Sequence, residues 1–410
     1  MHKKNTHCRI CLSETLVKVI SLGTQALANS FLKKEDLDSE EHAFPLDVYW
    51  CETCHLAQLL DVVSKELMFS NYIYFSSGMP KLSDHFSNYA MDVMERFLEP
   101  NDFVVEIASN DGILLKFFKE RGYRVLGIDP ATNVVKIAEE RGVPTMNDFF
   151  SEVLAKEIVK THGKAKTIMA NNVVAHIDDH HDLAKGIAAL LSDDGVFVFE
   201  APYLIDMFLE LAYDTVYHEH LSFLAIRPLQ VLFKKYGLEI FDVKLYPVQG
   251  SSIRVFVGKQ GAHNVLPSVA TFVQKEVSLG LDTREAYEIL ATRVAASKDQ
   301  LVTLLQKLKQ EGKTLAGYGA PAKGNTLLNY CHIGTDFLDF CLDDLPSKQG
   351  LYTPGMHIPV VSRVYAESHL PDYYVLLAWN YEKAILEKEA AFRAQGGKFI
   401  IPIGDTIRIV

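Results

Sequence analysis

The sequence has little cysteine, no excess of positive charge and no long apolar run. Six cysteines in 410 residues are too few for a disulfide-stapled scaffold, and they suit thiols or metal ligands in a reducing compartment. Lys and Arg number 41 against 52 Asp and Glu, so the net charge of −11 argues against nucleic-acid and membrane partners. No apolar run approaches the ~20 residues that span a bilayer. The charged start at 1–8 precedes no apolar stretch, so we expect no secretory signal and a cytoplasmic protein.

What is present is an ordinary globular composition. Hydrophobic residues make up 48% of the chain and charged residues 23%, which excludes a disordered chain. The length suits roughly two to three domains. We expect a monomer or a simple homo-oligomer.

Four of the six cysteines form two pairs, each with a two-residue gap: Cys8, Cys11, Cys51 and Cys54. Two such pairs supply four thiolates, the ligand set of tetrahedral zinc. Their wide separation leaves room for a hairpin, with a strand at 43–50. His7 and His55 flank the pairs as alternative ligands, and four buried free thiols are the other alternative. Four protein ligands leave no open position on the metal, so the zinc is expected to be structural. We expect Cys331 and Cys341 in the core.

An alternation of strands and helices begins near residue 103. An apolar run at 103–107 passes through small residues to Gly112, and a helix is expected at 113–121. A second buried strand, 123–129, ends in Asp129. Strand, small-residue turn, helix, strand and acid form the doubly wound nucleotide-binding pattern.

The first turn of this unit favours a cofactor without phosphate. It lacks the Gly-x-Gly-x-x-Gly of dinucleotide sites and the Gly-Lys-Ser/Thr of phosphate loops. An acid in the turn would repel a pyrophosphate but pair with an amino group, and an acid after the second strand would hold ribose hydroxyls. Both features indicate S-adenosylmethionine, and a generic crossover is the alternative. We expect cofactor contacts from Glu106, Ala108, Asn110, Asp111, Gly112, Asp129, Pro130, Asp148, Phe149, Asn171 and Asn172.

Further strands complete the central unit. They are expected at 165–172 and 195–202, followed by a hairpin of 240–246 and 252–257. A hairpin that closes an otherwise parallel sheet is typical of class I methyltransferases rather than of dinucleotide dehydrogenases.

The last third begins with a long amphipathic helix at 285–310. Its apolar residues recur at three- and four-residue steps: Ile289, Leu290, Val294, Leu301, Leu304, Leu305 and Leu308. A strand, a Gly-x-Gly-x-x-Ala turn and a helix follow from 314, which predicts a second nucleotide-type α/β unit. Lys323 beside this Gly-rich turn suits a phosphate, and a structural turn with a surface lysine is the alternative.

Polar residues follow the fourth and fifth strands of the central unit. His176 comes after 165–172, and Tyr217-His-Glu-His220 comes after the fifth strand and its helix. Carboxyl ends of strands meet at one edge, and Tyr217 and His220 would share one face of a helical turn. Histidine has a pKa near 6.5, which suits a base, and Glu219 would hold an imidazole in one tautomer. A capping or surface histidine and a core tyrosine are the alternatives.

These motifs together resemble the S-adenosylmethionine-dependent C-methyltransferases that act on nucleotide-linked keto-deoxysugars. Besides the cysteine pairs, the shared segments are Tyr72–Ser77, Glu106–Gly112, Tyr217–Ser222 and Gly317–Asn325, and the resemblance covers nearly the whole chain. Ala108 and Asn110 stand where the general methyltransferase motif has glycine. The segment 249–254 is similar to a variant of the family's His-Gly-Gly-Ser-x-Arg.

The resemblance implies methylation at C3 of a 4-keto-6-deoxy sugar carried by a nucleoside diphosphate, in branched deoxysugar biosynthesis. It implies His220 as the base and Glu219 as the group that orients an imidazole. Tyr217, His176 and Tyr72 would orient the sugar or stabilise an enolate. It also implies substrate contacts from Tyr74, His218, Arg254, Lys323 and Asn325.

Two other functions compete with this interpretation. One is an NAD(P)-dependent nucleotide-sugar oxidoreductase that uses Gly317-x-Gly319 and an acid at 343 or 344. The other is a non-enzymatic adaptor built on the four-cysteine module.

The predicted fold is α/β with three parts. They are a small zinc-binding domain at 1–70, a class I methyltransferase domain with a Rossmann-like sheet at 71–260, and a second Rossmann-like α/β domain at 261–410.

Overall fold

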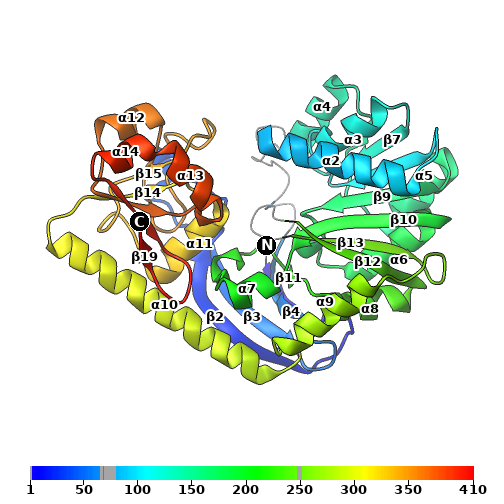
Figure 1. Cartoon of the computed structure of the whole chain (residues 1–410), viewed down its shortest axis with the longest axis horizontal. Coiled ribbons are helices and arrows are strands. Elements are labelled where there is room, and N and C mark those ends of the chain that lie inside the picture. Colours follow the sequence, from blue (N-terminus) through cyan, green and yellow to red (C-terminus); the bar gives the residue numbers. More distant parts are fainter. Residues whose placement is uncertain (1, 65–67, 69–79, 247–251) are drawn as a thin grey trace.

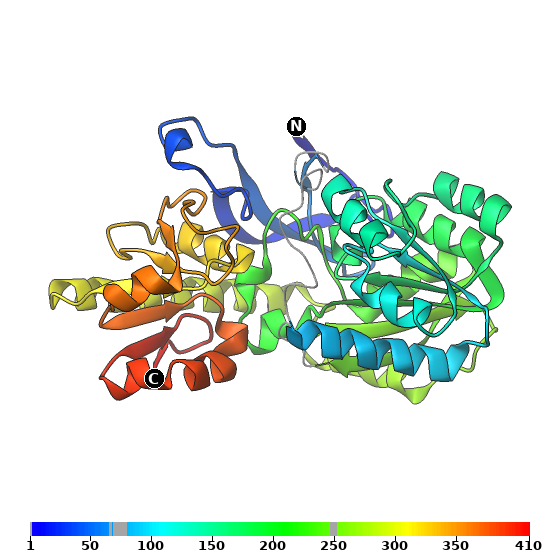
Figure 2. The ribbon, with the colours of Figure 1, turned by 90° about the horizontal axis from the view of Figure 1, so that it is seen from above.

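Two α/β lobes stand on either side of an N-terminal β-sheet (Figure 1). The computed structural model describes residues 2–64, 68, 80–246 and 252–410. The central part of the sequence forms one lobe and the last hundred residues form the other. Seen from above, strands of the N-terminal sheet run between the two lobes (Figure 2).

The N-terminal sheet contains a strand from the middle of the chain. Its order is β11-β4-β3-β2, all antiparallel: β2 Leu16–Ala26, β3 Ala43–Cys51, β4 Ala57–Leu59 and β11 Ser222–Phe223. β2 and β3 form the hairpin predicted between the cysteine pairs. A separate ribbon pairs β1 (His2–Lys4) with β5 (Asp61–Val63). Because β11 belongs to the central part of the sequence, the sheet joins the N-terminal domain to the central lobe.

The central lobe has the class I methyltransferase sheet. Its order is β12-β13-β10-β9-β6-β7-β8, and β13 alone among these strands runs antiparallel to its neighbours β10 and β12. The strands are β6 Phe103–Ile107, β7 Arg124–Ile128, β8 Thr145–Met146, β9 Ala165–Asn171, β10 Leu191–Pro202, β12 Leu238–Tyr246 and β13 Ser252–Lys259. The strand order reverses between β6 and β9, which is where open α/β sheets bind ligands.

Helices cover both faces of this sheet, and alternate strand residues pack against each layer. In β6, Val104 joins a core with α2 and α3, whereas Val105 joins the core on the opposite face. The helices are α2 Pro80–Phe97, α3 Ile113–Lys119, α4 Thr132–Glu140, α5 Glu152–His162, α6 His180–Leu190, α7 Ile205–Leu209, α8 Ile226–Lys235 and α9 Pro267–Ser278. No described helix has the length and apolar character that a membrane crossing requires.

The C-terminal lobe is the second Rossmann-like unit that the sequence predicts. Its sheet order is β16-β15-β14-β17-β18-β19, parallel except for β19. The strands are β14 Leu315–Tyr318, β15 Cys341–Leu342, β16 Val360–Val361, β17 Tyr373–Leu376, β18 Lys398–Ile401 and β19 Arg408–Ile409. The helices are α11 Ala322–Cys331, α12 Arg363–Ser368, α13 Glu382–Lys388 and α14 Ala390–Ala394. Cys331 and Cys341 lie in the core, as expected.

The long helix α10 (Arg284–Gln310) spans from the central lobe to the C-terminal lobe (Figure 1). Tyr287 packs edge-on against Phe208 of the central lobe, with ring centroids 5.0 Å apart. Farther along, Arg293 donates to the carbonyl of Phe208 (2.6 Å) and pairs with Asp405 (2.7 Å). The helix therefore fixes how far apart the two lobes stand.

The tip of the β2–β3 hairpin docks on the C-terminal lobe. Leu32 and Tyr352 form an isolated antiparallel bridge. Glu41 accepts hydrogen bonds from the Gly355 N–H (2.9 Å) and contacts the His357 ring nitrogen (3.0 Å). The N-terminal hairpin thus closes the space between the lobes from one side.

The buried face of α10 generates a stability prediction. Leu301 is fully buried, whereas Ile289, which the sequence pattern placed in the same stripe, is 55% exposed. We expect Leu301→Ala to lower the free energy of unfolding by about 2–5 kcal/mol, because it leaves a cavity. The matched control Ile289→Ala should stay within about 0.5 kcal/mol of the original protein. Urea unfolding followed by circular dichroism measures both, and equal losses would contradict the structure.

Candidate active site

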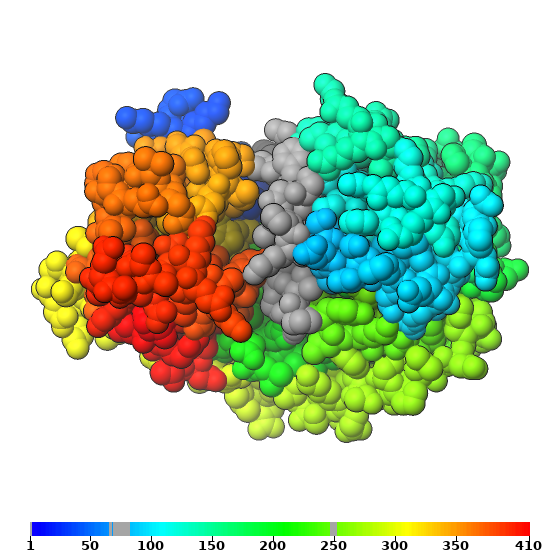
Figure 3. Space-filling view, turned by 45° about the horizontal axis from the view of Figure 1, so that its top comes forward, coloured from blue at the N-terminus to red at the C-terminus, as the bar shows by residue number. Residues whose placement is uncertain are grey.

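One cavity of about 1760 Å³ lies between the two lobes and the N-terminal sheet. The lobes face each other across the middle of the molecule (Figure 3). All three parts of the chain contribute lining residues, among them Asn29 and Phe31, Glu106 and Asp129, His176 and His220, and Lys323 and Lys348. Residues from the carboxyl ends of both Rossmann-like sheets therefore meet in one space.

The loop after β6 has an unusual backbone that explains its composition. Ala108, Asn110 and Gly112 have φ values of 53°, 49° and 76°, all in the left-handed region that favours glycine. The general methyltransferase motif has glycine at these positions. Asp129, after β7, accepts the N–H groups of Asn110 and Ala131, both at 2.9 Å. This carboxylate fixes the loop while lining the cavity.

The residues around this loop fit S-adenosylmethionine. Among the described residues of the central lobe that line the cavity, four buried oxygens have no hydrogen-bond partner: Glu106 Oε2, Ser109 Oγ, Asn171 Oδ1 and Asn172 Oδ1. Burial raises the pKa of Glu106 well above its usual value. A cationic amino group supplies the donors that these acceptors lack and would stabilise the charged carboxylate. The amino-acid end of the cofactor therefore suits this corner.

The adenosine end fits the next part of the cavity. Burial raises the pKa of Asp129, and the two N–H donors oppose that rise. Asp129 lines the cavity, and each of its oxygens has a second lone pair that would accept a ribose hydroxyl. Pro130, Asp148 and Phe149 line the same side, and the Asp148 carboxylate accepts the Phe149 N–H at 2.7 Å.

Two expected cofactor residues lie outside the cavity and act on the fold. The Asp111 side chain is fully buried and pairs with Arg141 at 3.0 Å, so it does not present its charge to an amino group. Gly112 caps α3, and a Cβ there would lie 3.1 Å from Val143. Neither residue lines the cavity, which corrects the expectation of direct cofactor contacts.

His220 is held as a neutral imidazole with a defined tautomer. Its Nδ1 lies 2.7 Å from the Thr215 carbonyl, which only accepts, so Nδ1 carries the proton. Its Nε2 lies 2.8 Å from the Tyr217 hydroxyl, which donates to it. Burial lowers the pKa of His220 to about 4, although the Thr215 carbonyl favours the charged form. At neutral pH the basic lone pair on Nε2 is present.

His176 lies next to His220. It ends the short helix η3 (Val174–His176) after β9, and the two ring centroids are 5.0 Å apart. Burial, with a smaller contribution from His220, lowers the pKa of His176 well below its usual value. The sequence therefore brings the two histidines together as predicted.

The segment from 217 to 220 differs from its prediction in two respects. It forms a turn after η4 (Tyr213–Thr215) rather than a helix, although Tyr217 and His220 still meet. Glu219 does not orient an imidazole, because its carboxylate accepts from Asn29 Nδ2 at 2.6 Å. Burial raises the pKa of Glu219 to about 7, against the Asn29 hydrogen bond. The Thr215 carbonyl orients His220 instead. The sequence could not indicate this contact, because every residue has a main-chain carbonyl.

His218 and Glu219 line the cavity on the side of the N-terminal domain. The His218 Nε2 donates to the Phe44 carbonyl at 3.2 Å, and burial lowers the pKa of this imidazole. Tyr72 and Tyr74, expected beside the sugar, lie outside the described residues.

The C-terminal lobe contributes two half-buried lysines to the cavity. Lys323 is the second residue of α11, and its Nζ lies 4.2 Å from the Trp379 ring centroid. Burial lowers the pKa of Lys323 to about 8, against the attraction of Asp214, whose carboxylate accepts from Trp379 Nε1 at 2.6 Å. Lys348 Nζ donates to the Ala320 carbonyl at 2.8 Å. The sequence pattern singled out Lys323, whereas for Lys348 it indicated only that the loop at 343–350 lies at the carboxyl ends of the second sheet and faces the same cleft.

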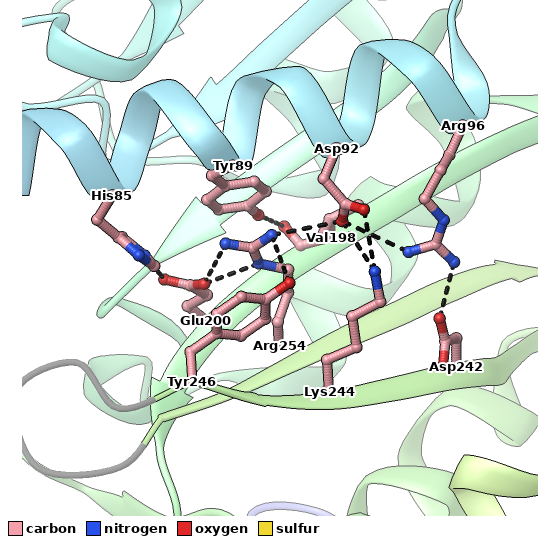
Figure 4. A network of polar contacts seen from close by, with 10 residues as sticks. All are labelled: His85, Tyr89, Asp92, Arg96, Val198, Glu200, Asp242, Lys244, Tyr246 and Arg254. Carbon is pink, nitrogen blue, oxygen red and sulfur yellow. Dashed lines mark hydrogen bonds and ion pairs between the residues drawn. The ribbon is translucent and has the colours of Figure 1, made fainter.

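Arg254 and Asn325, expected to contact substrate, are placed elsewhere. Arg254 is 1% exposed; its Nε donates to Glu200 at 2.7 Å, and the guanidinium carbon lies 3.6 Å from the Tyr89 ring centroid (Figure 4). The buried Asn325 donates to the Ala28 carbonyl at 2.7 Å, which docks the hairpin. Neither residue lines the cavity, so both serve the fold.

The four paired cysteines come together in the N-terminal domain. All four sulfurs lie within 4.8 Å of one another, and the Cys8–Cys54 and Cys11–Cys51 distances are both 3.5 Å. This set fits a tetrahedral zinc ion with no open position, as predicted for a structural site. The alternative ligands are otherwise engaged, since His7 pairs with Glu14 at 2.9 Å and His55 stacks on Trp50.

Comparisons with known proteins agree with this arrangement. Three family models match in succession: a zinc binding domain at residues 8–69, a methyltransferase domain at 83–243 and a C-methyltransferase C-terminal domain at 247–404. The chain is similar to the C-methyltransferase NovU of Streptomyces niveus, with 39% identity over 398 residues that cover 97% of this chain and 95% of the relative.

Solved structures similar to the chain include an S-adenosylmethionine-dependent methyltransferase from Clostridium acetobutylicum. It has a TM-score of 0.34 and 13% identity, covering 44% of this chain and 92% of its own. Another is the magnesium protoporphyrin IX methyltransferase of Synechocystis with bound SAH, with a TM-score of 0.35 and 12% identity, covering 43% and 83%.

The different placements of two acids generate a binding prediction. We expect Asp129→Asn to weaken S-adenosylhomocysteine binding about 10- to 100-fold, because hydrogen bonds to a charged group contribute about 1.5–3 kcal/mol. The control Asp111→Asn should keep the affinity and lower only thermal stability, since it loses the pair with Arg141. Titration calorimetry measures the affinities. A larger affinity loss in the Asp111 variant would contradict the assignment.

Proposed function

This chain belongs to the family of S-adenosylmethionine-dependent C-methyltransferases, and from that premise we propose that it methylates C3 of a 4-keto-6-deoxy sugar carried by a nucleoside diphosphate. The observation that carries the proposal is the neutral His220 imidazole, with Nε2 as its basic atom. It lies in the same cavity that the loop after β6 lines. Transfer of a methyl group to carbon requires such a base when the carbon is acidified by a neighbouring ketone.

His220 is proposed to remove the proton from C3. The C–H electron pair moves into the C3–C4 bond as the ketone becomes an enolate, and the proton goes to Nε2. The Thr215 carbonyl, 2.7 Å from Nδ1, stabilises the imidazolium that forms. When bound, S-adenosylmethionine would supply an electrophilic methyl group to C3, with the S–CH3 bond pair staying on sulfur as S-adenosylhomocysteine leaves.

Tyr217 is proposed to stabilise the enolate oxygen. In the structure its hydroxyl donates to His220 Nε2 at 2.8 Å, the atom that must accept the sugar proton. Substrate binding would turn this hydroxyl from Nε2 to the ketone oxygen, where it donates to the developing negative charge. His176, 5.0 Å from His220 between ring centroids, is in position to orient the sugar, and Tyr72 is proposed for the same task.

The C-terminal lobe is proposed to bind the diphosphate. Gly319 has a φ of 83° in the turn before α11, and a Cβ there would lie 3.0 Å from the Cβ of Ala378, so the turn requires glycine. The helix N-terminus that follows this turn favours an anion. Lys323 and Lys348 line the cavity beside this turn and supply positive charge. Apart from the histidines, few cationic groups face the remainder of the described cavity, which supports binding of the anion here.

The nicotinamide alternative has one observation for it and one against. Asp343 accepts the N–H groups of Ala320 (2.8 Å) and Leu345 (2.9 Å), which reproduces the pattern around Asp129 in the cofactor unit. However, Lys348 Nζ lies 3.9 Å from Asp343 and would compete with a ribose for this carboxylate.

We also infer a cytoplasmic location, because a cluster of zinc thiolates suits a reducing compartment.

The base assignment generates a rate and pH prediction. We expect His220→Gln to lower kcat about 10²- to 10⁴-fold and to retain S-adenosylhomocysteine affinity. Burial lowers the pKa of His220 to about 4, and a base acts when neutral. kcat/KM should therefore rise with pH through about 4 and show no inflection from this group near 6.5.

The control for this experiment is His181→Gln. His181 lies on α6, where its Nδ1 is 2.7 Å from the Tyr236 hydroxyl. It does not line the cavity, so its loss should leave the rate unchanged. Methyl transfer from labelled cofactor to a 4-keto nucleotide sugar measures both variants. Full activity in His220→Gln would overturn the base assignment.

The lysines generate a separate prediction on substrate affinity. We expect Lys323→Ala and Lys348→Ala each to raise KM for the nucleotide sugar about tenfold or more, because each removes a charge-assisted contact with phosphate. S-adenosylhomocysteine affinity should be unchanged in both. The control Lys383→Ala changes a lysine of α13 that does not line the cavity. An unchanged KM in both cavity variants would count against this diphosphate site.

A further inference from the structure

The side chain of Arg9 links the zinc-binding module to the central lobe by hydrogen bonds. It stands between Cys8 and Cys11, and its side chain is almost completely buried, with 4% of the residue exposed. Its Nε donates to the Asp178 carboxylate at 3.0 Å, and its Nη1 donates to the Leu221 carbonyl at 3.2 Å. An arginine of the first cysteine pair thus bonds to two segments more than 160 residues away in the sequence.

The two central-lobe partners of Arg9 come shortly after His176 and His220 in the sequence. Asp178 comes two residues after His176, and Leu221 comes one residue after His220. We propose that Arg9 is a positioning residue that fixes the separation of His176 and His220, and so couples the zinc module to the catalytic cluster. The inference rests on the proposed role of His220.

Arg9 is itself fixed at its base, which a positioning residue requires. Its main-chain N–H donates to Gln58 Oε1 at 3.1 Å, and its Nη1 also donates to the Leu59 carbonyl. The Leu59 N–H donates to the Leu221 carbonyl at 2.9 Å, so strand β4 holds the same acceptor. With zinc thiolates on both sides of it, residue 9 cannot move independently of this sheet.

The geometry points to an effect of shape rather than of charge. The lowered pKa of His220 comes from burial, opposed by the Thr215 hydrogen bond within its own segment, and that of His176 comes from burial and His220. The planar Arg9 guanidinium donates to four acceptors at once, on Asp178, Gln58, Leu59 and Leu221, whereas a lysine ammonium on a flexible stem does not reproduce that fork. Arg9→Lys therefore keeps the charge and removes the positioning.

The experiment compares Arg9→Lys and Arg9→Gln in the full zinc-loaded chain. We expect both to lower kcat about 10- to 100-fold, the cost of displacing a reacting group by about 1 Å. Zinc content, S-adenosylhomocysteine affinity and the pH dependence of kcat/KM should remain those of the original protein. In nitrogen-15 histidine NMR spectra, the ring signals of His176 and His220 should shift and that of His181 should not.

The control variant is Arg96→Lys, which alters an arginine paired with Asp242 at 2.7 Å on the far end of α2. It should keep kcat and the histidine spectra. Original kcat in Arg9→Lys, or unmoved His176 and His220 signals in both Arg9 variants, would overturn the proposal. The spectra need no sugar, so a failure of the proposed sugar reaction would leave this result readable.

A second hydrogen bond between the same two segments provides a test in case the Arg9 variants do not fold. His180 Nε2 lies 3.0 Å from Ser222 Oγ and joins the same two segments beside Arg9. If neither Arg9 variant binds S-adenosylhomocysteine, Ser222→Ala decides instead. A fall in kcat with shifted His176 and His220 signals supports positioning through these segments, and original values for both overturn it.

Discussion

The structure depends on the short pairing of β11 with β4. Ser222 pairs with Gln58 and Phe223 with Ala57, so two residues shortly after the turn at 217–220 belong to the N-terminal sheet. Sheet hydrogen bonds fix register, which sets the direction in which the preceding turn presents His220. The same sheet sends its hairpin to the C-terminal lobe, where Glu41 and Asn325 make the docking contacts. One sheet therefore positions both His220 and the opposite wall of the cavity.

Burial sets the protonation of the groups that face this cavity. It lowers the pKa of His220 to about 4 and of Lys323 to about 8, and it raises the pKa of Glu219 to about 7. In each case the neutral form gains, because a low-dielectric environment disfavours charge. A neutral imidazole is the form that accepts a proton from carbon, and the lysine remains largely charged for an anion. Among the described residues, the cavity thus holds a neutral imidazole, His220, and a largely charged lysine, Lys323, neither of them in a direct ion pair.

The two Rossmann-like lobes share one hydrogen-bond pattern but differ in the residues beside it. After the second strand of each, an acid accepts two main-chain N–H groups and fixes the turn after the first strand: Asp129 in one lobe and Asp343 in the other. Asp129 lines the cavity, and the nearby Glu106 Oε2 and Asn171 Oδ1 have no hydrogen-bond partner among the described residues, which suits a ribose and an amino group. Beside Asp343 stands Lys348, which changes a sugar-binding corner into a cationic one. A shared architecture can therefore serve cofactor in one lobe and substrate in the other.

The sequence by itself determined the local features of this protein, and only the tertiary structure decided the contacts between distant segments. Cysteine spacing predicted the zinc ligands, apolar periodicity predicted α10, and the strand pattern predicted both Rossmann-like sheets, because each follows from residues near one another. The sequence also brought His176, Tyr217 and His220 together, since carboxyl ends of neighbouring strands meet at one edge. It misplaced Asp111 and Arg254, whose charges are neutralised by Arg141 and Glu200. It gave no sign of Asn29 beside Glu219 or of Arg9 beside Leu221. Those pairs join residues far apart in the chain, and no local pattern records a hydrogen bond that only folding creates.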